Sequence, residues 1–164
     1  MTEKIKLINA KEDPIILFSE WFEEAKQKEI NVPNAMNLST ISESLMPSSR
    51  IVLLKSFDNN GFVFYTNVES KKGNSINFNP QVSLNFYWKS LLRQIRIEGI
   101  AKLVANKEAD EYFESRPEGS KIGAWASDQS SELKTREELI NKIKKYTEKY
   151  KKNKNSWLIK RLYP

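Results

Sequence analysis

The sequence contains no cysteine and no histidine among its 164 residues. Thiol nucleophiles, disulfides and thiolate metal sites need cysteine, while Ser-His-Asp triads, imidazole acid–base steps and most catalytic zinc sites need histidine. These classes of chemistry are therefore excluded, and we expect no metal site. If the protein is an enzyme, its reactive centre is a bound cofactor or an arrangement of carboxylates, lysines and hydroxyls.

Long hydrophobic runs are also lacking. No stretch approaches the roughly 20 apolar residues of a membrane span, and residues 1–13 lack the apolar core of a signal peptide. Four Trp, six Tyr and eight Phe argue against a disordered chain. We expect one domain over residues 1–164, in a reducing, cytoplasmic compartment and without a membrane partner.

The formal net charge of +6 is unevenly distributed. Residues 131–164 hold 11 Lys and Arg against 4 Asp and Glu, whereas residues 1–130 are close to neutral. The basicity is concentrated in residues 142–154, where a solvated helix face is the simpler interpretation. Nucleic-acid binding through this basic tail is the less favoured alternative, and we expect no nucleic-acid partner.

Hydrophobic periodicity predicts a helix, a sheet and then more helices. Asp13-Pro14 is typical of a helix start, and apolar residues recur every three or four positions up to residue 25. Strands are predicted over residues 35–41, 50–57, 62–66, 82–88 and 94–104, with a hairpin turn over 58–61. Further helices are predicted over 107–115, with Asn106 as N-cap, over 120–126, and after a capping box formed by Thr135 and Glu138. This order indicates an α+β, mainly β fold, in which an antiparallel sheet curls or closes.

Cationic and hydroxyl residues follow the ends of the predicted strands. Arg50 and Lys55 flank an apolar run, Tyr65 and Thr66 end the next strand, and residues 70–73 (SKKG) form a predicted turn. Such donors beside glycine suit a phosphate group, which needs several charge-assisted hydrogen bonds. Solvation of the sheet edge by single cations is the alternative interpretation.

Two further groups have similar chemistry. Tyr112, Arg116, Gly119 and Ser120 bring a cation and two hydroxyls to a predicted helix end, which suits a second anion. The amides of Gln94 and Gln129, with Ser130, could pair with the edge of a heterocycle. Together these groups favour one phosphorylated cofactor and one phosphorylated substrate.

A series of ordered motifs over residues 13–150 resembles the pyridoxamine 5′-phosphate oxidase family. The motifs are RIVLLK at 50–55, FVFYTN at 62–67, SKK at 70–72, NP at 79–80, RQ at 93–94, YFESRP at 112–117, SKIGAW at 120–125 and QS at 129–130. The resemblance implies an FMN-binding split β-barrel with FMN at the interface of a homodimer. It also implies oxidation of pyridoxamine or pyridoxine 5′-phosphate to pyridoxal 5′-phosphate, in vitamin B6 metabolism.

The resemblance also assigns site residues by position. The implied FMN contacts are Arg50, Ile51, Val52, Leu53, Leu54, Lys55, Tyr65, Thr66, Lys71, Lys72, Gln94, Gln129 and Ser130. The implied contacts to the substrate phosphate are Lys55, Tyr112, Arg116 and Ser120. No catalytic side chain is implied beyond the flavin, which takes a hydride from the substrate C4′ carbon and is reoxidised by O2 to give H2O2.

The C-terminal part departs from the family pattern. In the family, the chain continues past the last helix into strands with a tryptophan, an arginine and an Arg-x-His segment near the substrate. Here residues 151–164 are a basic linker followed by residues that resemble the family's extreme C-terminus, so a family segment is missing before Trp157. This departure motivates the alternative function of a flavin- or pyridoxal-phosphate-binding protein of the same fold without oxidase activity.

Overall fold

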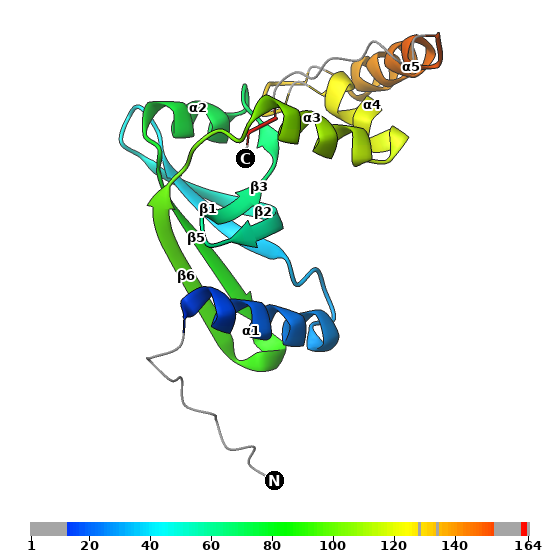
Figure 1. The fold of residues 1–164 in the computed structure, drawn as a ribbon. Coiled ribbons are helices and arrows are strands. Elements are labelled where there is room, and N and C mark those ends of the chain that lie inside the picture. Colours follow the sequence, from blue (N-terminus) through cyan, green and yellow to red (C-terminus); the bar gives the residue numbers. More distant parts are fainter. Residues whose placement is uncertain (1–12, 128, 134, 153–161, 164) are drawn as a thin grey trace.

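The computed structural model describes residues 13–127, 129–133, 135–152 and 162–163. Helix α1 (Pro14–Lys28) begins as the sequence predicts, because the Asp13 carboxylate accepts hydrogen bonds from the backbone N–H groups of Ile15 and Ile16. Its apolar face buries Phe18, Phe22 and Ala25. This helix lies at one end of the sheet (Figure 1).

A curled antiparallel sheet forms the centre of the molecule, which confirms the predicted fold class. Its strands are β1 (Ala35–Ile41), β2 (Pro47–Asp58), β3 (Gly61–Phe64), β5 (Gln81–Trp88) and β6 (Arg93–Ile100). Their spatial order is β3-β2-β1-β5-β6. The register shifts between Leu54 and Ser56 where β2 pairs with β3, so β2 has an irregularity at Lys55.

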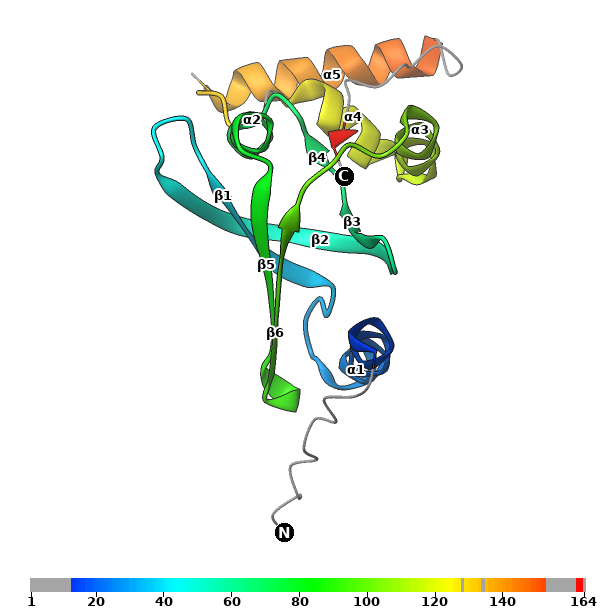
Figure 2. The same ribbon diagram turned by 60° about the vertical axis from the view of Figure 1, so that its left-hand side comes forward.

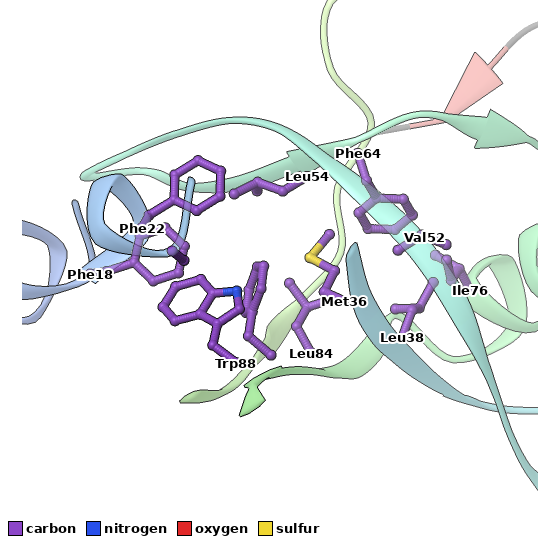
Figure 3. Close-up of a cluster of buried hydrophobic side chains, with 12 residues drawn as sticks. Phe18, Phe22, Met36, Leu38, Val52, Leu54, Phe64, Ile76, Leu84 and Trp88 are labelled. Carbon is purple, nitrogen blue, oxygen red and sulfur yellow. The ribbon is translucent and has the colours of Figure 1, made fainter. Parts of the chain in front are cut away.

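The inner face of this sheet and α1 form the hydrophobic core. Phe18 and Phe22 of α1 pack against Phe86 and Trp88 of β5, with ring centroids between 5.3 and 6.0 Å apart. Figure 3 shows Phe18, Phe22 and Trp88 gathered near α1, and a second group of Met36, Leu38, Val52, Phe64 and Ile76 continuing the cluster toward the other end. The core therefore runs the length of the sheet.

Four helices gather at the end of the sheet opposite α1 (Figures 1 and 2). They are α2 (Lys71–Phe78), α3 (Asn106–Ser115), α4 (Glu118–Ala126) and α5 (Arg136–Lys152). The short strands β4 (Thr66–Asn67) and β7 (Leu162–Tyr163) pair beside them. The Thr135 hydroxyl accepts a hydrogen bond from the Glu138 N–H, as the predicted capping box requires.

Several predicted boundaries are wrong. Residues 70–73 do not form a turn as predicted. Ser70 is the N-cap of helix α2, and residues 71–73 are the first residues of that helix. The last strand ends at Ile100 rather than 104. Helix α3 has Ala105 as its N-cap without a side-chain hydrogen bond, so Asn106 is the first helical residue. Helix α4 starts at Glu118, immediately after Pro117.

The predicted break in the family pattern before Trp157 lies outside the described residues, which resume only at β7. Within the described part of the chain, no helix is long and apolar enough to cross a membrane. In the same ranges, no group of three or more acidic side chains could hold a metal ion.

Candidate functional site

Arg50 lies on the inner side of β2, at the end of the sheet near α2. Its guanidinium donates to the Leu38 carbonyl oxygen at 3.1 Å, to the Thr40 hydroxyl at 2.8 Å and to the Ser48 hydroxyl at 2.8 Å. Burial lowers its pKa from the ordinary value. All three acceptors are neutral, so the guanidinium is oriented by the strands while its charge is not compensated by them.

Lys72 lies in the first turn of α2, beside this guanidinium. Its ammonium donates to the Gln129 side-chain oxygen at 2.7 Å and to the Ser70 hydroxyl at 3.2 Å. The Thr66 hydroxyl donates to the same Gln129 oxygen at 3.5 Å. Burial and, after it, the positive charge of Arg50 lower the pKa of Lys72. We call Arg50, Thr66, Ser70, Lys72 and Gln129 the basic cluster.

The basic cluster has no acidic partner among the described residues. The ion pairs found there join other side chains, such as Arg93 with Glu24 and Lys142 with Glu138. Two half-buried cations that repel each other and contact only neutral oxygens are unfavourable unless an anion joins them. The start of α2 adds its backbone N–H groups and positive dipole end. The arrangement therefore fits a phosphate.

Gly73 allows α2 to begin at this position. A Cβ atom at Gly73 would lie 2.1 Å from the Val68 carbonyl oxygen, which is backbone and cannot move aside easily. The Ser70 hydroxyl also accepts a hydrogen bond from the Gly73 N–H at 3.3 Å. The glycine of the SKKG motif is thus required for the close approach of the helix start to the preceding turn.

A pocket of about 360 Å³ adjoins the basic cluster. It is lined by Tyr65, Thr66, Asn67, Tyr112, Phe113, Arg116, Ser120, Gly123, Ala124, Trp125, Ser127 and Gln129. Thr66 and Gln129 belong to both the pocket and the basic cluster, so the two are contiguous. The pocket combines an aromatic lining with one cation and several hydroxyls, as a small phosphorylated ring compound would require.

Tyr65 and Tyr112 stack in this pocket, with ring centroids 3.7 Å apart and planes 5° apart. The Lys55 ammonium lies over the Tyr112 ring, 5.6 Å from its centroid. The Arg116 guanidinium lies 5.7 Å from the Phe113 ring centroid and lines the pocket. Tyr112, Arg116 and Ser120 thus line one pocket, while Lys55 lines a second cavity and lies near the first one over the Tyr112 ring. Their binding of a substrate phosphate, which the family resemblance implies, stays a prediction.

Gln94 is not near the basic cluster, although the sequence groups them. The strand pairing places it opposite Tyr87 on the outer face of the sheet, where its amide donates to the Asn85 side chain at 2.8 Å. Ile51 and Leu53 also point to this outer face, whereas Val52 and Leu54 are buried in the core. One copy of the chain therefore cannot bring all the predicted FMN contacts to one site by their side chains.

The backbone of β2 offers a different contact. Strand β3 pairs with β2 only from Leu54 onward, while β1 pairs with residues 47–53 on the other side. The edge of β2 that precedes Leu54 is thus without a strand partner among the described residues. Lys71 is exposed at the first position of α2, and Ser130, with φ 68°, follows Gln129 in the loop before α5.

Three polar residues of the site escaped the sequence-based prediction. Thr40 and Ser48 orient Arg50, and Glu108 accepts a hydrogen bond from the Tyr65 hydroxyl. They come close through strand pairing and helix packing, which local patterns do not reveal. Ser70, which the sequence placed among the phosphate donors of the SKKG motif, accepts a hydrogen bond from Lys72.

Comparison with known families agrees with this geometry. The family model described as pyridoxamine 5′-phosphate oxidase matches residues 22–150. The chain belongs to the pyridoxamine 5′-phosphate oxidase family. Both the basic cluster and the pocket lie within the matched region.

Similar family members are bacterial proteins named pyridoxine/pyridoxamine 5′-phosphate oxidase. The chain is 54% identical over 143 residues to the one from Pelagibacter ubique, with 87% of this chain and 68% of that protein covered. It is 52% identical to the one from Bartonella quintana, covering 92% of this chain and 74% of the relative. The Caulobacter vibrioides relative is 54% identical, and 82% of this chain matches 60% of it. The chain thus spans about 60 to 74% of the length of these relatives.

Solved structures show the same fold. A crystal structure of PhzG from Burkholderia lata, in complex with tetrahydrophenazine-1-carboxylic acid, matches with a TM-score of 0.81 and 28% identity, covering 87% of this chain and 72% of PhzG. A pyridoxamine 5′-phosphate oxidase-related, FMN-binding protein from Nostoc punctiforme matches with a TM-score of 0.65 and 14% identity, covering 79% of this chain and 72% of its own. The curled sheet is therefore the split barrel of this family.

Proposed function

We propose that the protein is an FMN-dependent oxidase that converts pyridoxamine or pyridoxine 5′-phosphate to pyridoxal 5′-phosphate. Family membership supports the class of reaction. The observation that supports it most directly is the contiguity of two anion sites, the basic cluster and the pocket around Arg116, which share Thr66 and Gln129. Two phosphorylated molecules, cofactor and substrate, would lie next to each other there.

The basic cluster fits the phosphate of FMN. Arg50 and Lys72 supply two positive charges beside the N-terminus of α2, and the repulsion between them is relieved when a dianion binds. The unpaired edge of β2 before Leu54 offers backbone groups to the rest of the cofactor, which would allow Val52 to contact it although its side chain is buried. Leu54 lies outside this edge, because it pairs with Phe64. Bound flavin would supply the redox chemistry, with O2 as the final acceptor and H2O2 as its product.

The pocket would hold the substrate by its phosphate. Arg116, Ser120 and the Tyr112 hydroxyl are the donors, and the Lys55 ammonium adds a second charge from the irregularity in β2. Binding a phosphate away from the reacting carbon uses binding energy for orientation. The aromatic lining would exclude water from around the substrate ring. These residues would bind and orient the substrate and take no part in bond breaking.

A homodimer completes the proposed site. The outer face of the sheet exposes Ile51 (65%), Tyr87 (63%) and Ile100 (65%), apolar side chains that a partner would cover. Gln94 lies on the same face, opposite Tyr87 in the register. In a dimer formed through this face, Gln94 of one copy would contact the FMN held by the other copy.

The test is reconstitution followed by turnover. Purified protein loaded with FMN should be yellow and should release one H2O2 for each pyridoxamine 5′-phosphate oxidised. Protein that binds no FMN would contradict the proposal at its first step. Protein that binds FMN but does not turn over either phosphorylated vitamer would instead support the alternative, a binding protein of the same fold. The relatives' greater length makes this second outcome worth testing separately.

A further inference from the structure

Glu108 is a carboxylate next to the pocket that neither the sequence motifs nor the family comparison assigns to the site. It lies in the first turn of α3, exposed on its outer side, and its Oε1 accepts a hydrogen bond of 3.3 Å from the Tyr65 hydroxyl. Tyr65 lines the pocket, so Glu108 is connected to the site through one side chain.

Helix geometry gives Tyr65 two contacts on one face of α3. Glu108 and Tyr112 are four residues apart, and residues at this spacing are neighbours on the helix surface. Tyr112 stacks on the Tyr65 ring while Glu108 binds the Tyr65 hydroxyl. One helix face therefore fixes both the plane of the Tyr65 ring and its orientation within that plane.

The stack needs such an anchor. Aromatic pairs prefer offset or edge-to-face arrangements with centroids about 4.5–7 Å apart. The two tyrosine rings lie closer and almost parallel, at 3.7 Å and 5°. A parallel stack can slide, and sliding would move Tyr112 away from the Lys55 ammonium, which lies 5.6 Å from its ring centroid. A hydrogen bond at the far end of Tyr65 opposes this movement.

Glu108 also affects the titration of the Tyr65 hydroxyl. Burial first, and then the charge and hydrogen bond of Glu108, raise the pKa of Tyr65 to about 12. The phenol is a neutral donor at neutral pH with or without this shift, and its single proton is engaged by Glu108. Toward a ligand in the pocket, Tyr65 then presents its ring and oxygen lone pairs.

We propose that Glu108 is a positioning residue: by holding the Tyr65 hydroxyl it fixes the Tyr65–Tyr112 stack, and through it the donors that bind the substrate phosphate. The kinetic consequence of this role rests on the proposed oxidase function. The hydrogen bond between Tyr65 and Glu108 does not depend on that function. Glu108 is not among the residues that line the pocket, so its loss should weaken substrate binding and leave the chemical step unchanged.

The kinetic test uses the FMN-loaded protein with pyridoxamine 5′-phosphate. Glu108→Ala should raise KM about fivefold, less than the loss of a charged hydrogen bond made directly to the substrate because Glu108 acts through Tyr65, with kcat within twofold. Glu108→Gln, whose amide oxygen can still accept, should restore most of KM. Glu111→Gln, on the same helix and 67% exposed, is the matched control and should match the wild type. Unchanged KM in Glu108→Ala, or an equal rise in the control, would overturn the role.

A double-mutant cycle with Tyr65→Phe tests the path of the effect. If Glu108 acts through Tyr65, the double variant should have the KM of the worse single variant. Independent, multiplying effects would contradict the proposal, because they would mean that Glu108 acts by another path.

An optical titration separates this inference from the proposed function. The tyrosinate absorbance assigned to Tyr65, by difference from Tyr65→Phe, should appear at lower pH in Glu108→Gln than in the wild type. If the wild type shows no oxidase activity, the proposed function fails, yet this titration and the affinity for pyridoxal 5′-phosphate still test Glu108. An unshifted Tyr65 titration, or unchanged pyridoxal 5′-phosphate affinity in Glu108→Ala, would overturn the inference.

Discussion

Single side chains in this site are held by neutral neighbours and left with uncompensated charge. Arg50 contacts a carbonyl and two hydroxyls, and Lys72 contacts a hydroxyl and an amide. These cations are held in place, but their charge is not neutralised. Such an arrangement favours tight binding of an anion, because the side chains lose little conformational entropy when the ligand binds.

Lys72→Ala should weaken FMN binding about 10- to 100-fold, since a hydrogen bond from a charged donor contributes about 1.5–3 kcal/mol. Titration of apo-protein with FMN, followed by quenching of flavin fluorescence, measures the Kd. Lys107→Ala removes a lysine that is 87% exposed and paired with Glu111, so it is the control for net charge. Equal weakening in both variants would show that Lys72 acts only through the overall charge.

Arg116→Ala should raise the KM for pyridoxamine 5′-phosphate at least tenfold while changing kcat little, because Arg116 is placed to bind the phosphate and not the reacting carbon. Steady-state kinetics with FMN-saturated protein measure both constants. The KM of Arg116→Lys should lie between those of the wild type and Arg116→Ala, since lysine keeps the positive charge and loses the planar guanidinium. A normal KM in Arg116→Ala would remove Arg116 from the substrate site.

Whole elements bring these residues together. Helix α2 begins at the basic cluster because Ser70 caps it and because Gly73 leaves room for the Val68 carbonyl. Helix α1 is held at the opposite end of the sheet, where Glu24 pairs with Lys28 and Arg93 and where Arg93 lies 4.5 Å from the Trp21 ring centroid. The start of α2 and the packing of α1 on the sheet thus depend on different residues and can be tested separately.

Gly73→Ala should lower stability by about 1–3 kcal/mol, the usual range for overpacking, and should also weaken FMN binding, because the start of α2 must shift. Urea unfolding measures the first effect and FMN titration the second. Gly119→Ala is the control, since a Cβ at this helical position meets nothing within 4 Å. Gly119→Ala should be neutral or slightly stabilising, as alanine favours helix.

Glu24→Gln should remove part of the acid sensitivity of folding. Hydrogen bonds from Lys28 and then Arg93 lower the Glu24 pKa below its ordinary value of 4.5. A lowered folded-state pKa stabilises the fold above the unfolded value, and this stabilisation is lost as pH falls from about 5 through the folded pKa. The Glu24 side chain is 33% exposed, so we expect no more than about 1 kcal/mol.

Urea unfolding between pH 3 and 7 measures this loss, because this range brackets the ordinary glutamate pKa of 4.5. Glu23→Gln removes a neighbouring carboxylate that is 62% exposed and paired with Lys26 at 2.6 Å. An equal change in pH dependence for Glu23→Gln would mean that general charge, and not the contacts of Glu24, explains the effect.

The molecule as a whole has two different sheet faces. The inner face is filled by α1 and the aromatic core, while the outer face exposes apolar side chains beside Gln94. An uncovered apolar sheet face on a well-packed domain is typical of an interface. The site that one chain builds is therefore only part of the proposed FMN site.

Tyr87→Lys should convert the proposed dimer to monomer and reduce FMN affinity, because a charge placed in the centre of a buried apolar face is costly. Sedimentation velocity measures the mass, and FMN titration of the same samples measures the affinity. Ile30→Lys, at a side chain that is 94% exposed on the loop after α1, is the control and should remain dimeric. A monomeric wild type that binds FMN with normal affinity would contradict the dimer.

Much of the fold could be predicted from local patterns. The Asp13 cap, the five sheet strands and the Thr135 capping box follow from nearest neighbours and periodicity, which depend on a few adjacent residues. Helix α2 was missed because its apolar positions are few and its start depends on Ser70 and Gly73 meeting a preceding turn. Arg50, Tyr65 and Arg116 were candidates for anion binding because of their residue types at predicted strand and helix ends, and the family resemblance added their specific roles toward FMN and substrate.

The sequence by itself determined which chemistry is possible. The lack of cysteine and histidine excludes thiol and imidazole catalysis, and the order of the motifs identifies the family. Only the tertiary structure decided that Arg50 and Lys72 lie close enough for their charges to interact, that Gln94 lies on the outer face of the sheet, and that Glu108 accepts a hydrogen bond from Tyr65. The physical reason is that strand register and helix packing set distances between residues far apart in the chain, whereas composition and local spacing do not.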